Sequence, residues 1–288
     1  MIPRRISPPD EERGTAEHVV THDGRPRRYR IHIPPVVPPA AALVVQLHGG
    51  GGNGTGLDRL TRFHRLADRE RCVVLSPSGF DRHWNDGRSP TVAGVDDVGF
   101  LVALVEGAAG RLPIDRRRIY VVGISNGAMM AARLAHEVPD HFAAFGQVAG
   151  TAPEDATEWW QPSRPVPIIQ IHGTADPILP YEGGAVLRRR PGAEDPGRVL
   201  GVDQWAALVA GHNRAGGPTV ERIPPDVTVR RWAGPSASGD VEFWQVAGGG
   251  HTWPGGIQYL PERTIGTTSA TFDATATLWR FFAAHALP

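Results

Sequence analysis

The sequence has little of what marks several large classes of protein. Its 288 residues include one cysteine, so no disulfide can form within the chain. No apolar run approaches the roughly 20 residues that a membrane-spanning helix needs. Acidic and basic residues balance at 30 each, and basic runs do not exceed three residues, so a nucleic-acid partner has little support. What is left is an ordinary globular protein.

The amino terminus lacks a visible export signal. An arginine pair, Arg4 and Arg5, is followed by polar residues and prolines instead of the apolar segment that such a signal requires. We expect residues 1–16 to form a disordered leader and residues 17–288 to form one domain, because no repeat or linker interrupts the chain. The lone thiol, Cys72, begins an apolar run and is expected to be a buried strand residue.

Segments typical of strands and of helices alternate from residue 43 onward. The expected strands are residues 17–21, 28–33, 43–47, 72–75, 119–122, 142–148, 166–171, 227–232 and 241–246. Helices are expected at residues 57–69, from Asp96 and Asp97 to about 108, and at residues 128–135, 202–210 and 272–285. This order predicts an α/β fold, with a mostly parallel twisted sheet flanked by helices and antiparallel strands at its start.

A serine stands at the most informative point of this pattern. Ser125 lies between Gly123 and Gly127, where the expected strand 119–122 turns into the expected helix 128–135. A G-x-S-x-G sequence between a strand and a helix is typical of a nucleophile elbow, in which the turn lifts the hydroxyl clear of the sheet. The motif alone is weak, because a serine that caps the helix would have the same sequence.

The groups that a serine nucleophile needs follow other expected strands. A base must take the hydroxyl proton and a carboxylate must orient that base, and His251 and Asp176 stand at two such strand ends. The order Ser125, Asp176, His251 is the order of an α/β-hydrolase triad. Two backbone N–H groups, those of Asn126 and Gly50, are candidates for the oxyanion site.

Each of these residues also has a plain structural interpretation. The glycine run after residue 48 resembles a phosphate-binding loop but lacks its Gly-Lys-Ser/Thr ending. His48 and His172 end strands beside glycine and are expected to be scaffold histidines. Asp96 and Asp97 are expected to cap a helix and complement its dipole rather than to hold a metal. Only the joint placement at strand ends favours catalysis.

Six stretches make the sequence resemble a known family. They are LHGGGGNG from Leu47, WNDGR from Trp84, VDDVGFL from Val95, GISNGAMM from Gly123, IHGTADPILPYEGG from Ile171 and GGGHTWPGG from Gly248. They are similar to the polyhydroxybutyrate depolymerase and feruloyl or acetylxylan esterase group of α/β-hydrolases, especially its small LpqC-like members. The resemblance implies an α/β-hydrolase fold without a large lid, and it implies that Ser125 is the nucleophile, Asp176 the acid and His251 the base.

The resemblance also implies an activity. We expect a serine carboxylic ester hydrolase that forms an acyl-enzyme and needs no cofactor or metal. The expected substrates are soluble feruloyl or acetyl polysaccharide esters, or hydroxyalkanoate and polyester oligomers. Acyl transfer or peptidase action by the same triad, and a non-catalytic binding module on this scaffold, are the alternatives. Trp84, Tyr181 and Trp253 are expected to contact the substrate, and Trp159 and Trp160 to cover the entrance.

Two departures from the family narrow this expectation. Relatives often carry cysteines near residues 211–236, where this chain has none, and polymer-degrading members often append a binding domain that the sequence does not show. Soluble esters or oligomers are therefore favoured over insoluble polyester. The family suggests an extracellular or periplasmic location, and the sequence indicates neither a membrane nor an obligate protein partner.

Overall fold

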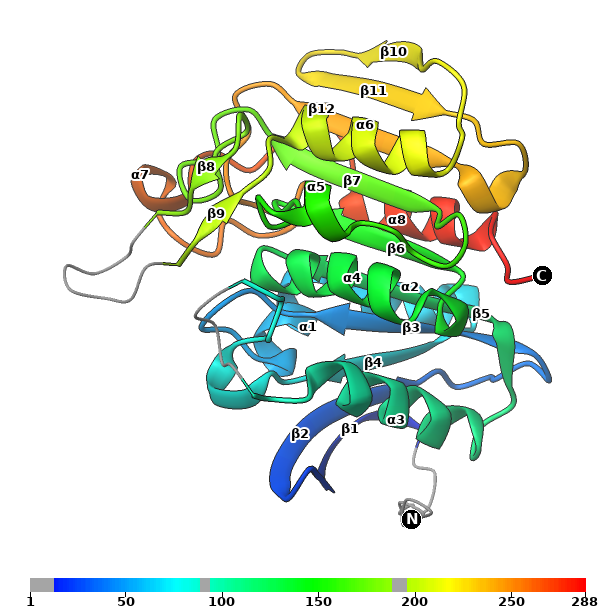
Figure 1. Ribbon diagram of the computed structural model, residues 1–288. Coiled ribbons are helices and arrows are strands. Elements are labelled where there is room, and N and C mark those ends of the chain that lie inside the picture. The colour runs from blue at the N-terminus through cyan, green and yellow to red at the C-terminus, as the bar shows by residue number, and fades with distance from the viewer. Residues whose placement is uncertain (1–12, 89–93, 188–195) are drawn as a thin grey trace.

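A ten-stranded sheet forms the centre of the molecule. The computed structural model describes residues 13–88, 94–187 and 196–288 (Figure 1). The strands lie in the order β1-β2-β4-β3-β5-β6-β7-β12-β11-β10. Their bounds are β1 Gly14–His22, β2 Arg25–Ile33, β3 Ala41–Leu47, β4 Val73–Pro77, β5 Ile114–Ile124, β6 Ala144–Val148, β7 Ile168–Gly173, β12 Val241–Val246, β11 Val227–Trp232 and β10 Thr219–Ile223.

The central strands are parallel and the strands at both edges are antiparallel. Strands β4, β3, β5, β6, β7 and β12 pair in parallel. At one edge β1 and β2 are antiparallel to each other and β2 to β4, and at the other edge β11 and β10 continue antiparallel from β12. Because parallel strands present their carboxyl ends at one edge of the sheet, the segments that follow β3, β5, β7 and β12 meet there.

Helices cover both faces of the sheet. On the face toward the viewer in Figure 1 lie α3 (Asp97–Ala109), α4 (Asn126–Glu137) and α6 (Val202–His212). The far face packs against α1 (Gly54–Thr61), α2 (Phe63–Glu70) and α8 (Ala274–Ala283). Shorter elements are α5 (Ala156–Trp159), α7 (Glu262–Ile265), the two-residue strands β8 (Gly184–Ala185) and β9 (Arg198–Val199), and 3-10 turns at Phe80–Arg82, Pro139–His141 and Ala237–Gly239.

The sequence of the central strand β3 explains why helices cover both faces of the sheet. Every residue of β3 is buried, with Leu43, Val45 and Leu47 in the core under α3 and α4 and with Ala42 and Val44 in the core under the opposite helices. A strand covered on both faces needs apolar residues at the positions that point to either face, which is why β3 is apolar at every position except Gln46.

The structure confirms the alternating α/β pattern and changes several details, of which three concern the main elements. The expected helix 57–69 is two helices, because Arg62 adopts a left-handed conformation between α1 and α2. Strand β10 was not predicted. Strand β1 begins at Gly14, inside the expected leader, whose residues 1–12 lie outside the described part of the chain.

No helix in the described ranges has the length and apolar character needed to cross a bilayer.

Candidate active site

Ser125 occupies a strained turn between β5 and α4. Its backbone has φ 58° and ψ −122°, a conformation that a residue with a side chain rarely adopts outside functional sites. The turn needs glycine on both sides of the serine. A Cβ atom on Gly123 would lie 2.1 Å from the Gly127 carbonyl oxygen, and one on Gly127 would lie 2.3 Å from the Leu47 carbonyl oxygen. These contacts give the G-x-S-x-G spacing its physical reason.

The interpretation of Ser125 as an ordinary helix cap is not supported. The serine stands at the N-cap position of α4, yet its side chain makes no capping hydrogen bond. Ser125 instead lines a cavity at the carboxyl edge of the sheet. Its hydroxyl has no hydrogen-bond partner among the described residues, as is expected of the serine in a nucleophile elbow.

Asp176 and His251 form a buried pair at the ends of β7 and β12. His251 Nδ1 lies 2.7 Å from Asp176 Oδ2, and both side chains are almost fully buried. The second carboxylate oxygen of Asp176 accepts the N–H groups of Ile178 and Leu179 at 2.8 and 2.9 Å. The pairing of β7 with β12 in parallel register brings residues 75 positions apart in the sequence into contact.

The surroundings of Asp176 keep it ionised. Burial alone would raise the pKa of this carboxyl, but the His251 charge and hydrogen bond, with smaller contributions from His172 and the Leu179 amide, hold it below its usual value. A carboxylate that stays charged can fix the His251 tautomer, with its proton on Nδ1 and its lone pair on Nε2.

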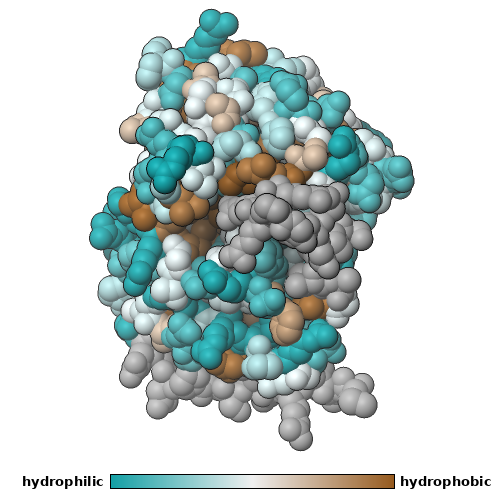
Figure 2. Space-filling model, turned by 90° about the vertical axis from the view of Figure 1, so that its left-hand side faces the viewer, coloured by the Kyte–Doolittle hydropathy of each residue, from teal (hydrophilic) through white to brown (hydrophobic). Residues whose placement is uncertain are grey.

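Ser125 and His251 open into the same cavity, which has a volume of about 310 Å³. The glycine turn at residues 48–53 contributes a polar part of the lining, and a set of apolar and aromatic side chains forms an apolar wall. Figure 2 views the molecule from this side and shows hydrophobic residues gathered around a hollow. The wall residues are Leu57, Leu60, Ile124, Ile257, Tyr259 and Leu260.

The glycine turn packs directly against the serine. A Cβ atom on Gly49 would lie 3.2 Å from Ser125 Cβ, closer than most side chains pack, so the turn lies tight against the serine. The N–H of Gly50 has no hydrogen-bond acceptor among the described residues. The N–H of Asn126 lacks an intrahelical acceptor, since Asn126 is the first residue of α4. Both predicted oxyanion donors are therefore free beside the serine.

His48 fixes the shape of this turn. The N–H of Gly79 donates to His48 Nε2 at 2.9 Å, which leaves the proton on Nδ1 to donate to the Gly49 carbonyl oxygen at 2.8 Å. Burial lowers the pKa of His48 from 6.5 to about 4, so the ring stays neutral. His48 acts as scaffold, as the sequence suggested.

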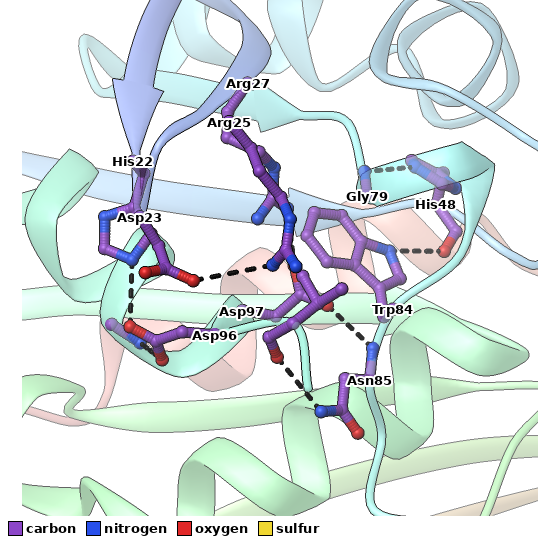
Figure 3. Close-up of polar contacts among 12 residues, drawn as sticks. His22, Asp23, Arg25, Arg27, His48, Gly79, Trp84, Asn85, Asp96 and Asp97 are labelled. Carbon is purple, nitrogen blue, oxygen red and sulfur yellow. Dashed lines mark hydrogen bonds and ion pairs between the residues drawn. The ribbon is translucent and has the colours of Figure 1, made fainter. Parts of the chain in front are cut away.

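A network behind the turn holds the loop that starts at Trp84. The Trp84 indole N–H donates to the His48 carbonyl oxygen at 3.0 Å, and the N–H of Asn85 donates to Asp97 at 2.7 Å (Figure 3). Asp97 is fully buried and pairs with Arg27, whereas Asp96 accepts the Gly99 N–H at 2.8 Å and caps α3. The expectation for Asp96 is confirmed, while Asp97 is an interior anchor.

The three aromatic residues expected to contact substrate lie elsewhere. Trp84, Tyr181 and Trp253 are buried, with exposed fractions of 0%, 8% and 1%, and none of them lines the cavity. Trp84 supports the glycine turn, and the Tyr181 hydroxyl donates to Asp203 at 2.7 Å. The described cavity gives no support to their role in substrate binding, which stays a prediction.

The residues that do line the apolar wall were missed by sequence reasoning. Leu57 and Leu60 belong to the stripe of a helix and were indistinguishable from ordinary core residues. Ile257 and Leu260 are 44% and 36% exposed and lie in a Gly/Pro-rich segment just after His251. Exposed apolar residues so close to a candidate base were the available signal.

Comparison with known proteins identifies the family. Residues 28–186, more than half of the chain, match the family described as esterase PHB depolymerase, that is, polyhydroxybutyrate depolymerase. The chain belongs to this family. It is accordingly a carboxylic ester hydrolase, as the resemblance predicted. A candidate esterase of Nocardia uniformis subsp. tsuyamanensis, NocK, is 33% identical over 91% of this chain and 80% of that protein.

Other relatives of this esterase family are more distant. Feruloyl esterase C of Emericella nidulans is 26% identical over 56% of this chain, and the match spans 59% of that protein. The structure of an acetyl xylan esterase from Aspergillus awamori superposes with a TM-score of 0.62 at 16% identity, covering 93% of this chain and 99% of that one. This likeness establishes the α/β-hydrolase fold.

Proposed function

We propose that this esterase hydrolyses its substrates through an acyl-enzyme formed on Ser125, with His251 as base and Asp176 as its orienting acid. The observation that carries the proposal is the buried 2.7 Å contact of Asp176 with His251, in a cavity that also contains the Ser125 hydroxyl. Nucleophilic catalysis requires a carboxylate on one nitrogen of the imidazole and room for the substrate at the other nitrogen. Asp176 and the cavity provide these for His251.

The reaction would follow from these positions. His251 Nε2 takes the Ser125 proton as the serine oxygen bonds to the acyl carbon. The oxyanion forms beside the N–H groups of Gly50 and Asn126, and its collapse breaks the ester bond while His251 returns the proton to the leaving alcohol. Water then attacks the acyl-enzyme by the same route, releasing the acid and restoring Ser125.

The cavity supports a bulky apolar acyl group over an acetyl group. The hydrophobic wall formed by Leu57, Leu60, Ile257 and Leu260 lies next to the serine, and the volume of about 310 Å³ suits an aromatic or medium-length aliphatic acid. A feruloyl or hydroxyalkanoate ester would bury apolar surface there, while an acetyl group would leave most of the apolar wall exposed to water.

A separate proposal concerns location. Because the chain belongs to the esterase family described above, we propose that it acts outside the cytoplasm.

The Ser125→Ala variant tests the mechanism. We expect kcat/KM for p-nitrophenyl butyrate to fall by at least roughly 10⁴-fold, and a fluorophosphonate probe to stop labelling the chain. Ser236→Ala, a change at an exposed serine, is the control and should label and turn over normally. Activity close to that of the native enzyme in Ser125→Ala would refute the assignment.

A panel of soluble esters tests the acyl preference. We expect methyl ferulate and p-nitrophenyl butyrate to be hydrolysed with higher kcat/KM than p-nitrophenyl acetate. Replacing Leu60 by Trp should fill part of the cavity beside the apolar wall. The preference should then be reversed, because acetyl is the acyl group that still fits. A preference for acetate in the native enzyme would contradict the proposal.

A further inference from the structure

A further buried histidine lies beside the proposed triad acid. His172 stands near the end of β7, four residues before Asp176, and its side chain is completely buried. Its Nε2 atom lies 3.1 Å from the carbonyl oxygen of Leu179 and 3.5 Å from Asp176 Oδ2. His172 therefore contacts the acid of the triad, although it has no part in the reaction described above.

The contact with Leu179 fixes the tautomer of His172. A carbonyl oxygen only accepts hydrogen bonds, so Nε2 carries the proton and donates it to Leu179. Nδ1 then carries the lone pair, and it has no hydrogen-bond partner among the described residues. Burial lowers the pKa of His172, and the His251 charge adds to this while the Asp176 charge opposes it without cancelling it. The ring is neutral at neutral pH and acts through one N–H group.

This N–H group holds the turn that orients Asp176. Leu179 uses both of its backbone groups: its N–H donates to Asp176 Oδ1 at 2.9 Å, and its carbonyl oxygen accepts from His172. The N–H of Ile178 donates to the same carboxylate oxygen at 2.8 Å. Within the described part of the chain, His172 is the one donor to the Leu179 carbonyl oxygen. Without it, a residue that orients the carboxylate loses its hydrogen bond to β7.

The segment before Asp176 has a different support. There the N–H of Ala175 donates to the Gly249 carbonyl oxygen at 2.9 Å, which ties the turn to the loop that carries the base. That loop holds the chain before the acid, and His172 holds the chain after it. A substitution of His172 therefore removes the second support and leaves the first in place.

Tyr181 restricts the imidazole to the orientation that reaches Leu179. The two rings meet edge to face, with centroids 6.2 Å apart and an interplanar angle of 73°. The Tyr181 hydroxyl donates to Asp203 on α6 at 2.7 Å, and Arg230 on β11 pairs with the same carboxylate. The tyrosine is thus anchored to two elements of the fold, and it limits rotation of the ring beside it.

We propose that His172 is a positioning residue for the triad acid. Its Nε2–H group holds Leu179, whose amide keeps the Asp176 carboxylate aimed at His251. The inference rests on the proposed triad and adds the residue that keeps its acid in place. Alignment matters because a carboxylate that turns away no longer stabilises the imidazolium formed as Ser125 attacks. A histidine that only filled the core would have no such effect.

Two polar substitutions of His172 separate positioning from packing. Glutamine can place its side-chain N–H near the position of Nε2, whereas asparagine places it near that of Nδ1. We expect His172→Asn to lower kcat/KM for p-nitrophenyl butyrate about 30-fold, mainly through kcat, and His172→Gln to lose at least about tenfold less. The acid limb of the pH profile of His172→Asn should also move about half a unit to lower pH, because the imidazolium loses part of its counter-charge.

His285→Gln is the matched control. His285 is buried, donates from Nδ1 to the Phe281 carbonyl oxygen at 2.7 Å and lies 3.4 Å from Asp240, but none of these residues lines the cavity beside Ser125. Glutamine does not reach the position of Nδ1, so this variant loses a buried hydrogen bond of the same kind. It should unfold at a lower temperature and keep the pH profile of the native enzyme.

Proton NMR supplies a readout that does not need turnover. The downfield signal of the proton between Asp176 and His251 should persist in His172→Gln and shift or broaden in His172→Asn. Recording it in the Ser125→Ala background separates this inference from the assignment of the nucleophile, which the kinetics of Ser125→Ala test alone.

Three outcomes overturn the inference. One is a folded His172→Asn with the kinetics and the proton signal of the native enzyme. Another is a loss in His172→Gln as large as that in His172→Asn. The third is the same shift of the acid limb in His285→Gln, which would show that any lost buried hydrogen bond has this effect.

Discussion

At the scale of single residues, His48 shows how a buried neutral histidine can fix the shape of a turn beside a candidate nucleophile. Both ring nitrogens are committed, one to the Gly79 N–H and one to the Gly49 carbonyl oxygen. Protonation would remove the acceptor that Gly79 needs and place a charge in a desolvated site. Protonation of His48 is therefore expected to destabilise the turn that carries Gly50.

The low pKa of His48 predicts a dependence of stability on pH. Between about pH 6.5 and pH 4 the unfolded chain binds a proton on His48 that the folded chain does not, so the free energy of unfolding falls as the pH falls. The full shift corresponds to ~3 kcal/mol. We expect urea unfolding at pH 7 and pH 4.5 to show a larger loss in the native protein than in His48→Gln. Equal losses would contradict this role.

Single residues also show which parts of the site were predictable. Ser125, Asp176 and His251 could be found because each follows a buried strand, and the ends of parallel strands converge. Trp84 and Trp253 lie equally near strand ends, but their side chains turn into the core. Whether a loop side chain points inward depends on contacts with distant segments, such as that of Trp84 with His48, and no local pattern records them.

At the scale of elements, Asn126 fastens the loop of Trp84 to the start of α4. Its side chain accepts the Trp84 N–H at 2.8 Å and donates to the Trp84 carbonyl oxygen and to Asp86. The side chain of Asn213 makes a similar set of hydrogen bonds elsewhere: it accepts the Val166 N–H and donates to the carbonyl oxygens of Val166 and Gly239. Asn126 and Asn213 therefore join backbone segments in the same way, and of these two asparagines Asn126 is the one next to the serine.

These two asparagines allow a paired prediction. Asn126→Ala and Asn213→Ala should each lower the free energy of unfolding by ~2–4 kcal/mol, because buried backbone groups lose their partners. Only Asn126→Ala should also lower kcat/KM of the protein that remains folded, because the loop and the glycine turn lose their shared anchor. Chemical denaturation and initial rates at low temperature measure the two effects. An equal fall in kcat/KM for Asn213→Ala would contradict the assignment.

The elements that the sequence did not predict have physical causes. Strand β10 has four exposed residues out of five and lies at the sheet edge, so its sequence carries no burial pattern. The break at Arg62 interrupts an amphipathic pattern that continues through α1 and α2, and arginine gives no warning of a left-handed conformation. The buried strands were predictable because burial on both faces demands apolar residues in sequence.

At the scale of the whole molecule, stability depends on helices pressed against both faces of one sheet. Gly146 in β6 is one point of close approach: a Cβ atom there would lie 2.7 Å from Leu278 on α8 and 2.9 Å from Val122 on β5. Helix α8 can pack this close to β6 because Gly146 has no side chain. A side chain at position 146 would therefore push α8 away from the sheet.

Two glycine substitutions test this view. Gly146→Ala should lower the free energy of unfolding by ~1–3 kcal/mol, since the added methyl group must displace α8 or the sheet. Gly211→Ala in α6 adds the same atom where nothing lies within 4 Å, and it should raise stability by ~0.5–1 kcal/mol. Thermal unfolding of both variants beside the native protein measures the difference. A stabilising Gly146→Ala would show that the layers are not in close contact there.

The position of Cys72 has a practical side. The only thiol of the chain is fully buried next to β4, and burial raises its pKa to about 12. It carries almost no thiolate at neutral pH and is out of reach of reagents. The native sequence is therefore already a background for site-specific labelling: a cysteine introduced at position 257 would take a maleimide fluorophore alone. The filling of the cavity beside Ser125 could then be followed by emission.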